Sequence, residues 1–204
     1  TSVSLSPDRI SAHTQATQQL LTQNSFDLQS FLAADIRRGL EQHYNLKIKA
    51  IIEGITEENG GSETTGSGVD GVLDASDIAF FLEELLRQGN VDPAGAYILT
   101  EPTLYREMRR ATLDAGSGLF AATSASRVGD YNAIVSTMFT DGNAYMVKPE
   151  DVVCAEWGGI NIQVDPYALA HKDVVRIIAN QYVDCAILRS AGVVGVDLDG
   201  TDSP

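Results

Sequence analysis

Apolar residues recur at every fourth position along residues 24–54. The stripe consists of Leu28, Leu32, Ile36, Leu40, Tyr44, Ile48 and Ile52. This spacing follows the α-helical period and predicts one long helix that ends at Gly54, where a C-terminal cap would lie. Such a helix is roughly 40 Å long, about the width of a compact domain of this size. Four residues turn by about 400°, so the stripe drifts around the axis and different elements must cover its two ends.

Three other segments have helical signals. Ser6 and Pro7 form a cap and first turn before an expected helix at 7–23, after a short extended start. Residues 74–90 form a second amphipathic pattern, with Asp74 as the expected N-cap and Gly89 as the stop. Its apolar face comprises Ile78, Phe81, Leu82 and Leu85.

The remaining helix is expected at 101–116. Pro102 lies in its first turn and Gly116 would end it. The residues expected to face inward are Leu104, Met108 and Ala111.

From residue 119 onward the period changes from four to two, which is typical of strands. The strand-like segments are 131–139, 142–148, 160–166, 173–181, 183–190 and 191–197, and 95–100 reads as a short buried strand before them. Turn residues separate these segments. Helices first and sheet later predict the α+β class.

Residues 55–71 are rich in Gly, Ser, Thr and acids, with almost nothing to bury, and are expected to form a loop or linker. The whole chain of 204 residues is long enough for one large domain or two small ones. Its apolar runs are too short for a transmembrane helix, and residues 1–10 lack the features of a secretory signal, so a cytoplasmic origin is expected. The net charge of −14 argues against a protein that reads DNA or RNA sequence.

The sequence contains no recognisable catalytic or metal-binding motif. No glycine run leads to the Lys-Ser/Thr of a phosphate-binding loop, and no Gly-x-Ser-x-Gly elbow is present. The histidines His13, His43 and His171 are isolated from one another and from the cysteines, which gives no zinc spacing. The tail around Asp197 and Asp199 resembles the opening of a calcium loop but ends without its bidentate glutamate. The sequence therefore predicts no catalytic, cofactor-binding or metal-binding residue.

Several side chains have a structural and a functional interpretation. Cys154 and Cys185 are expected to be two buried thiols rather than a disulfide. Trp157 is favoured as a core aromatic over a ligand-stacking one. The cluster Arg106, Arg109 and Arg110 is interpreted as a solvated helix face, with a patch for an acidic neighbour as the alternative. Residues 156–177 could be the wall of a pocket or a surface that meets other copies of the chain.

The order of elements resembles the major capsid protein of tailed phages, with the Hong Kong 97-type fold. The resemblance runs over nearly all of the chain and rests on three stretches: residues 10–54 match the approach to and passage along the family's spine helix, 95–110 its strand and proline-opened helix, and 156–196 its closing β-hairpin and final strand. None of the three is a strict motif, but their order and spacing together are specific.

The resemblance implies a peripheral domain at 1–57 with the spine helix, an axial α/β domain at 58–144, the peripheral β-hairpin at 145–187, and an axial return strand and tail at 188–204. It implies that 156–177 is a lattice surface beside the spine helix. Within it, Gly158 and Gly159 would mark a turn or bulge, and Asp165-Pro166 would open the hairpin tip.

Two departures from the family follow from the same resemblance. Its N-terminal arm and extended loop would precede Thr1, so the expectation is a chain that folds as a monomer or small oligomer without closing shells. Members that crosslink their subunits use a glutamate where Gln163 stands in this sequence, and an amide cannot serve as a general base.

The function implied is a structural, non-enzymatic capsid subunit that self-assembles into hexamers and pentamers around double-stranded DNA, which it holds without sequence recognition. Expected partners are other copies, with scaffolding, protease and portal proteins during assembly in the host cytoplasm, and no membrane. Two alternatives stay open: an encapsulin-like nanocompartment shell, and a small metal-dependent hydrolase or binding protein with its site in the 55–71 loop.

Overall fold

The protein is described from a computed structural model, which covers residues 3–17, 19, 28–58, 63–65, 77–112, 120–123, 126–139 and 142–197. The chain divides into two compact units. Unit 2 is formed by Ser4–Ile48 and Cys154–Ala186, and unit 1 by Lys49–Val153 and Ile187–Pro204 together with the first residues of the chain. Each unit is therefore built from segments that lie far apart in the sequence.

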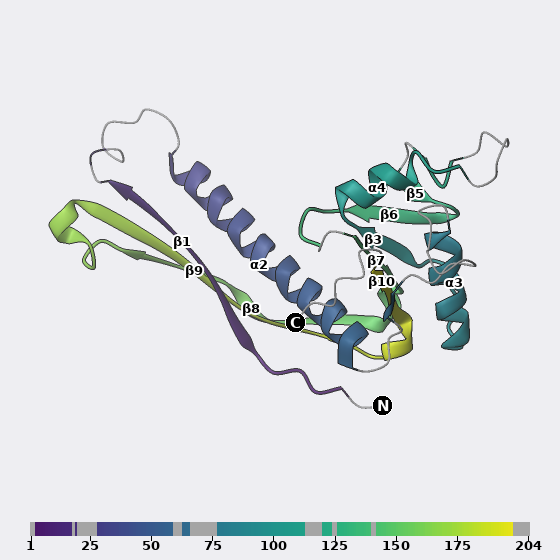
Figure 1. The fold of residues 1–204 in the computed structure, drawn as a ribbon. Helices are drawn as coiled ribbons and strands as arrows, with labels where there is room; N and C mark the ends of the chain where they lie inside the picture. Colours follow the sequence, from purple (N-terminus) through teal and green to yellow (C-terminus); the bar gives the residue numbers. More distant parts are fainter. Residues whose placement is uncertain are drawn as a thin grey trace. The chain divides into compact units, whose positions relative to one another are not determined.

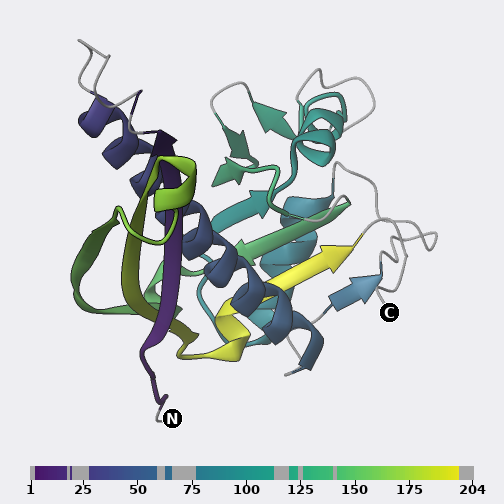
Figure 2. The same ribbon diagram turned by 90° about the vertical axis from the view of Figure 1, so that its left-hand side faces the viewer.

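Unit 2 contains a three-stranded sheet in the order β1-β9-β8 and most of the long helix α2. Its elements are β1 (Asp8–Thr17), α2 (Leu28–Glu58), β8 (Val152–Asp165) and β9 (Val174–Ile187), with the short η2 (Ala170–Lys172) between the last two strands. β1 pairs antiparallel with β9 over its whole length, from Asp8 opposite Val183 to Thr17 opposite Val174. Figures 1 and 2 show α2 running alongside this sheet.

The core of unit 2 lies between the predicted stripe of α2 and one face of the sheet. It comprises Ile36 and Leu40 from the helix, Ile10 from β1, and Ala179 and Val183 from β9. A Cβ atom added at Gly39 would meet the Cβ of Ala12 at 3.3 Å. Small residues at this crossing let the helix backbone approach β1 closely, so the stripe can reach the sheet.

Unit 1 contains a seven-stranded mixed sheet in the order β2-β10-β7-β3-β6-β5-β4. The strands are β2 (Glu63–Thr65), β3 (Tyr97–Thr100), β4 (Ala122–Thr123), β5 (Arg127–Val128), β6 (Tyr131–Val135), β7 (Asn143–Val147) and β10 (Val193–Asp197). The helices are α3 (Ile78–Gln88) and α4 (Pro102–Met108), with single turns η1 (Pro149–Asp151) and η3 (Ser190–Gly192). β3 pairs parallel with β6 and antiparallel with β7.

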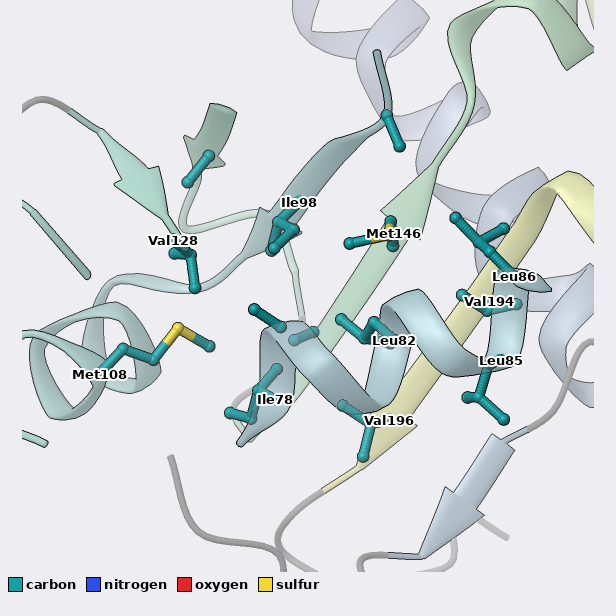
Figure 3. Packing of buried hydrophobic residues seen from close by; sticks show 14 of the residues in the cluster. Ile78, Leu82, Leu85, Leu86, Ile98, Met108, Val128, Met146, Val194 and Val196 are labelled. Atoms are coloured by element: carbon teal, nitrogen blue, oxygen red, sulfur yellow. The ribbon is translucent and has the colours of Figure 1, made fainter. Parts of the chain in front are cut away.

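Helix α3 covers one face of this sheet over β7 and β10 (Figure 3). Leu82 and Leu86 are fully buried and pack toward Met146 and Val194 of those strands. At the start of α4 the buried carboxylate of Glu101 accepts hydrogen bonds from the backbone N–H groups of Thr103 and Leu104, as an N-cap does. Burial of apolar side chains and hydrogen bonding of the free backbone N–H groups at the start of α4 both stabilise this unit.

The helix predicted at 7–23 is wrong, because residues 8–17 form strand β1. Within it, Ile10, Ala12, Thr14 and Ala16 alternate with more exposed positions, which is a strand pattern of period two. The cap signal at Ser6 and Pro7 is also not used: the Ser6 N–H donates to the Asp184 carboxylate at 2.9 Å. Pairing with β9 supplies hydrogen bonds along the whole segment and overrides its helical propensity.

Several predicted boundaries are corrected as well. Helix α2 continues through Gly54 to Glu58, and Glu63–Thr65 is a strand, so 55–71 is not one uninterrupted loop. Asp77 rather than Asp74 occupies the N-cap position of helix α3, and its side chain makes no capping hydrogen bond. Helix α4 ends at Met108, well before Gly116, which lies outside the described residues together with Asp74.

The strand predictions are largely confirmed, with corrections to their bounds and pairing: β6 ends at Val135 rather than at 139, and β8 begins at Val152 rather than at 160. The predicted strands 173–181 and 183–190 merge into one strand, β9, which ends at Ile187, and Ser190 begins η3. β7 pairs with β3 and β10 in the sheet of unit 1, whereas the predicted boundary at 144/145 placed most of it with the hairpin. None of the described helices is both long and apolar enough to cross a membrane.

Candidate interaction surface

An exposed apolar stripe follows the outer half of strand β8. Ile160, Ile162 and Val164 are 42%, 53% and 62% exposed, and their spacing of two places them on one face of the strand. β8 lies at the edge of its sheet, and no other strand of the described residues pairs with its outer side. Exposed edge strands with apolar side chains are sites where another chain can add.

A groove runs along this stripe and the adjacent surface of helix α2. One section, of about 580 Å³, is lined by Ala33, Ala34, Ile36, Arg37, Arg38, Leu40, Glu41, Ile160 and Ile162. The next, of about 440 Å³, shares Arg37, Leu40, Glu41 and Ile160 with the first and continues past Tyr44 to Asn45. The groove is therefore continuous over about three helical turns within unit 2.

The floor of the groove is apolar and its rim is charged. Ile36 and Leu40 are nearly fully buried at its base, whereas the rim residues Arg37 and Glu41 are exposed. Within the described part of the chain, neither rim residue forms an ion pair. An apolar floor between polar rims is the arrangement found at protein–protein interfaces.

The Asp165-Pro166 pair shapes the hairpin tip, as expected. The Asp165 carboxylate accepts hydrogen bonds from the backbone N–H groups of Tyr167, at 2.9 Å, and Ala168, at 3.1 Å. These two bonds lower the pKa of Asp165, the one from Ala168 most. The turn that results leaves the Tyr167 side chain 85% exposed.

Gly158 has a φ of +72° inside strand β8, and nothing lies within 4 Å of the Cβ atom that a side chain would add. The strand is continuous through Gly158 and Gly159, so the pair marks a local irregularity in β8 rather than a turn between elements. Left-handed backbone is strained for any residue with a side chain, which explains glycine here.

A cluster of charges anchors the start of β1 to the rest of unit 2. The Lys47 ammonium lies 2.8 Å from the Asp8 carboxylate and 3.4 Å from that of Asp184, and it also donates to the Val183 carbonyl. The hydrogen bond from the Ser6 N–H and the nearby Lys47 lower the pKa of Asp184. The cluster fixes strand β1, which packs against α2.

The residues considered for chemistry lie apart. His13, His43 and His171 are exposed, on β1, α2 and η2 respectively. No three His, Cys, Asp or Glu side chains gather at a metal-binding distance within the described ranges. Asp197 ends β10, and Asp199 lies outside the described residues.

The other predicted positions have mixed outcomes. Arg106, Arg109 and Arg110 are exposed, but only Arg106 lies within α4, because the helix ends at Met108. Trp157 is only half-buried and is not among the buried core residues, so its prediction as a core aromatic is wrong. Gln163 is exposed on β8, on the face opposite Ile162.

The sequence did not predict the groove, although Ile160, Ile162 and Val164 alternate with polar residues along it. That alternation predicts one buried face, and here the apolar face is left uncovered. For the stretch 156–177 the geometry favours a surface over a pocket wall.

A family model described as "Phage capsid family" matches residues 1–198. None of the curated proteins matches the sequence.

Solved structures similar to this chain include a capsid, a structure named for a phage and a virus-like particle. A capsid of an empty GTA particle has a TM-score of 0.71 at 18% identity, covering 95% of this chain and 72% of that one. A structure titled "Mycobacterium phage Che8" has a TM-score of 0.70 at 16% identity over 95% and 72% of the two chains. A virus-like particle from Pyrococcus furiosus has a TM-score of 0.69 at 13% identity over 94% and 77%. At these identities the likeness is one of fold.

Proposed function

This chain belongs to the phage capsid family, and from that premise we propose that it self-associates into hexameric and pentameric rings of a closed icosahedral shell around double-stranded DNA. The observation that carries the proposal is the family match over residues 1–198. The exposed apolar stripe and groove of unit 2 support it, because a shell subunit must present surface to its neighbours.

We assign unit 2, with helix α2 and the β8–β9 hairpin, as the peripheral domain, and unit 1, with the seven-stranded sheet, as the axial domain. In this assignment the axial domains gather around the ring centres. The α2–β8 groove of the peripheral domain receives a neighbouring copy. Each ring contact is weak by itself, and closure of the shell sums many of them.

The role is structural rather than enzymatic. Gln163 has an amide where a crosslinking relative would need a carboxylate base, so subunits of this type are held without covalent links. The net charge of −14 suits a container that encloses DNA without gripping it or reading its sequence. Assembly would take place in the host cytoplasm, with scaffolding, protease and portal proteins as further partners.

Electron microscopy of the full-length gene product, expressed in a bacterial cytoplasm, tests the proposal. The expected result is closed particles of uniform size. Soluble monomers that form no rings or shells at any concentration would contradict it.

Two variants of β8 test the assigned surface. Ile162→Glu places a charge in the apolar stripe and should abolish or greatly reduce particle formation. Gln163→Glu adds the same charge one residue away, on the opposite face of the strand, and should assemble as the wild type does. Both positions are exposed, so both variants should fold. If the two variants assemble equally well, the stripe is not a subunit contact.

A nanocompartment shell that encloses protein is the second candidate, because one similar structure is a virus-like particle. The contents of the particles distinguish the two. Nuclease-resistant DNA of genome length is expected for a capsid, and a co-purifying protein cargo without DNA would favour the nanocompartment.

A further inference from the structure

The two cysteines of the chain meet in unit 2. Cys154 lies on β8 and Cys185 on β9, which are neighbours in the sheet. At the base of this hairpin the Leu188 N–H donates to the Asp151 carbonyl at 2.7 Å. Cys154 comes three residues after Asp151 and Cys185 three residues before Leu188, so an uninterrupted antiparallel ladder places them opposite each other. Cys154 and Tyr44 of helix α2 both influence the pKa of the Cys185 thiol, as neighbouring groups do.

Opposed residues on antiparallel strands suit a disulfide. Their Cα atoms are about 4.5–5.5 Å apart, and a disulfide spans about 4.4–6.8 Å between Cα atoms. A bond between the two sulfur atoms would therefore close without movement of the backbone.

Burial keeps Cys185 as a thiol until an oxidant arrives. Burial, and next the hydrogen bond with Cys154, raise the pKa of the Cys185 thiol to about 12. Lys47 and the hydrogen bond to Tyr44 act in the opposite direction but are smaller effects. Cys185 is 5% exposed, whereas Cys154 is only half-buried. The two sulfurs thus differ in access, and a reagent from solvent reaches Cys154 first.

We propose that Cys154 and Cys185 form a redox pair, in which a small-molecule disulfide of the glutathione class oxidises them to an intramolecular disulfide. The Cys154 thiolate attacks the reagent disulfide, forming a mixed disulfide and releasing one thiol. Cys185 then attacks the Cys154 sulfur, its proton passes to the departing small-molecule sulfur, and a second thiol leaves. Two electrons pass from the cysteines to the reagent, and the products are one protein disulfide and two small thiols.

The bond would close the loop from residue 154 to residue 185 and hold the base of the hairpin together. Such a crosslink stabilises mainly by limiting the unfolded chain. The pair would stay reduced in a cytosol and close in an oxidising medium. That this happens to a shell after its release from a cell rests on the proposed function, whereas the chemistry of the pair does not.

The test is incubation of the folded chain with oxidised glutathione, followed by intact-mass and peptide mass spectrometry without reduction. The expected product has lost the two thiol hydrogens, retains no glutathione, and contains a peptide that joins Cys154 to Cys185. Its denaturant midpoint should rise, as followed by the fluorescence of Trp157, the single tryptophan of the chain and a residue of unit 2.

Two single variants separate the roles of the sulfurs. Cys185→Ser should accumulate a glutathione adduct at Cys154, because the second attack is missing. Cys154→Ser should stay unmodified while folded, because Cys185 is buried. A stable glutathione adduct on the wild type, disulfide-linked dimers, or a bridge that forms only in denaturant would overturn the proposal. All of these outcomes are read on the isolated chain, so a failure to form shells leaves the test unaffected.

Discussion

Truncation of Leu40 tests the packing of helix α2 against the sheet of unit 2. Leu40 is 2% exposed and contacts the cluster that includes Ile36, Ala179 and Val183. Leu40→Ala removes three carbon atoms, worth about 0.8 kcal/mol each in lost burial, or about 2.4 kcal/mol together. A cavity that the neighbours fill only in part adds about 1 kcal/mol. We expect the free energy of unfolding to fall by about 3–4 kcal/mol.

The control is Leu46→Ala on the same helix. Leu46 is 49% exposed, so the identical substitution should change the free energy of unfolding by less than about 0.5–1 kcal/mol. Intrinsic helix propensity changes equally in the two variants, and the difference between them isolates burial.

The assay is unfolding in urea, followed by the fluorescence of Trp157. Because this single tryptophan lies in unit 2, its signal reports the unit that contains the mutation even when the two units unfold separately. Equal midpoints for the two variants would refute the reasoning, since α2 would then not be packed through its apolar stripe.

The remaining predictions concern one ionisable group and two glycines. The pKa of Asp184 is lowered below its ordinary value of 3.8 in the folded state, so its stabilising effect is complete above that value and is lost as the pH falls through the lower, folded pKa. The midpoint of unit 2 should therefore drop on acidification below about pH 4, and Asp184→Asn should flatten that drop; an unchanged pH profile would contradict the Lys47 anchor. Gly158→Ala should lower the free energy of unfolding by about 1–2 kcal/mol, because φ there is +72°. Gly159→Ala, with an ordinary φ and open space around it, is the control, and equal effects would argue against left-handed backbone strain. In unit 1, a Cβ at Gly192 would collide with the carboxylate of Asp151, which is 2.8 Å from the Arg189 guanidinium; Gly192→Ala should lower the thermal midpoint of that unit, and calorimetry that shows no shift would refute this contact.

Local sequence patterns predicted much of the fold. The four-residue spacing from Leu28 to Ile52 predicted the long helix, and Ile36, Leu40 and Ile52 are buried as that stripe requires. The amphipathic pattern around Leu82 predicted α3 for the same reason. These predictions are reliable because the period of apolar residues along one element depends only on that element's own geometry.

The start of the chain shows where local patterns fail. Residues 8–17 have both helix-compatible composition and a period-two alternation, and only pairing with β9 made them a strand. Asp8 lies opposite Val183, far along the sequence, and no local signal contains that partner. Tertiary context can override weak intrinsic propensity because it satisfies a whole row of backbone hydrogen bonds at once.

The sequence by itself determined the class of the fold, the long helix, the strand-rich second half and the absence of a recognisable catalytic motif. Only the tertiary structure brought Ile160 and Ile162 beside Arg37 to form a groove, and set Cys154 against Cys185 on neighbouring strands. The physical reason is the same in both cases. The spacing of apolar residues along an element indicates which face of the element each residue occupies. The contacts of a residue across the fold depend instead on which distant segment pairs with its element and in what register.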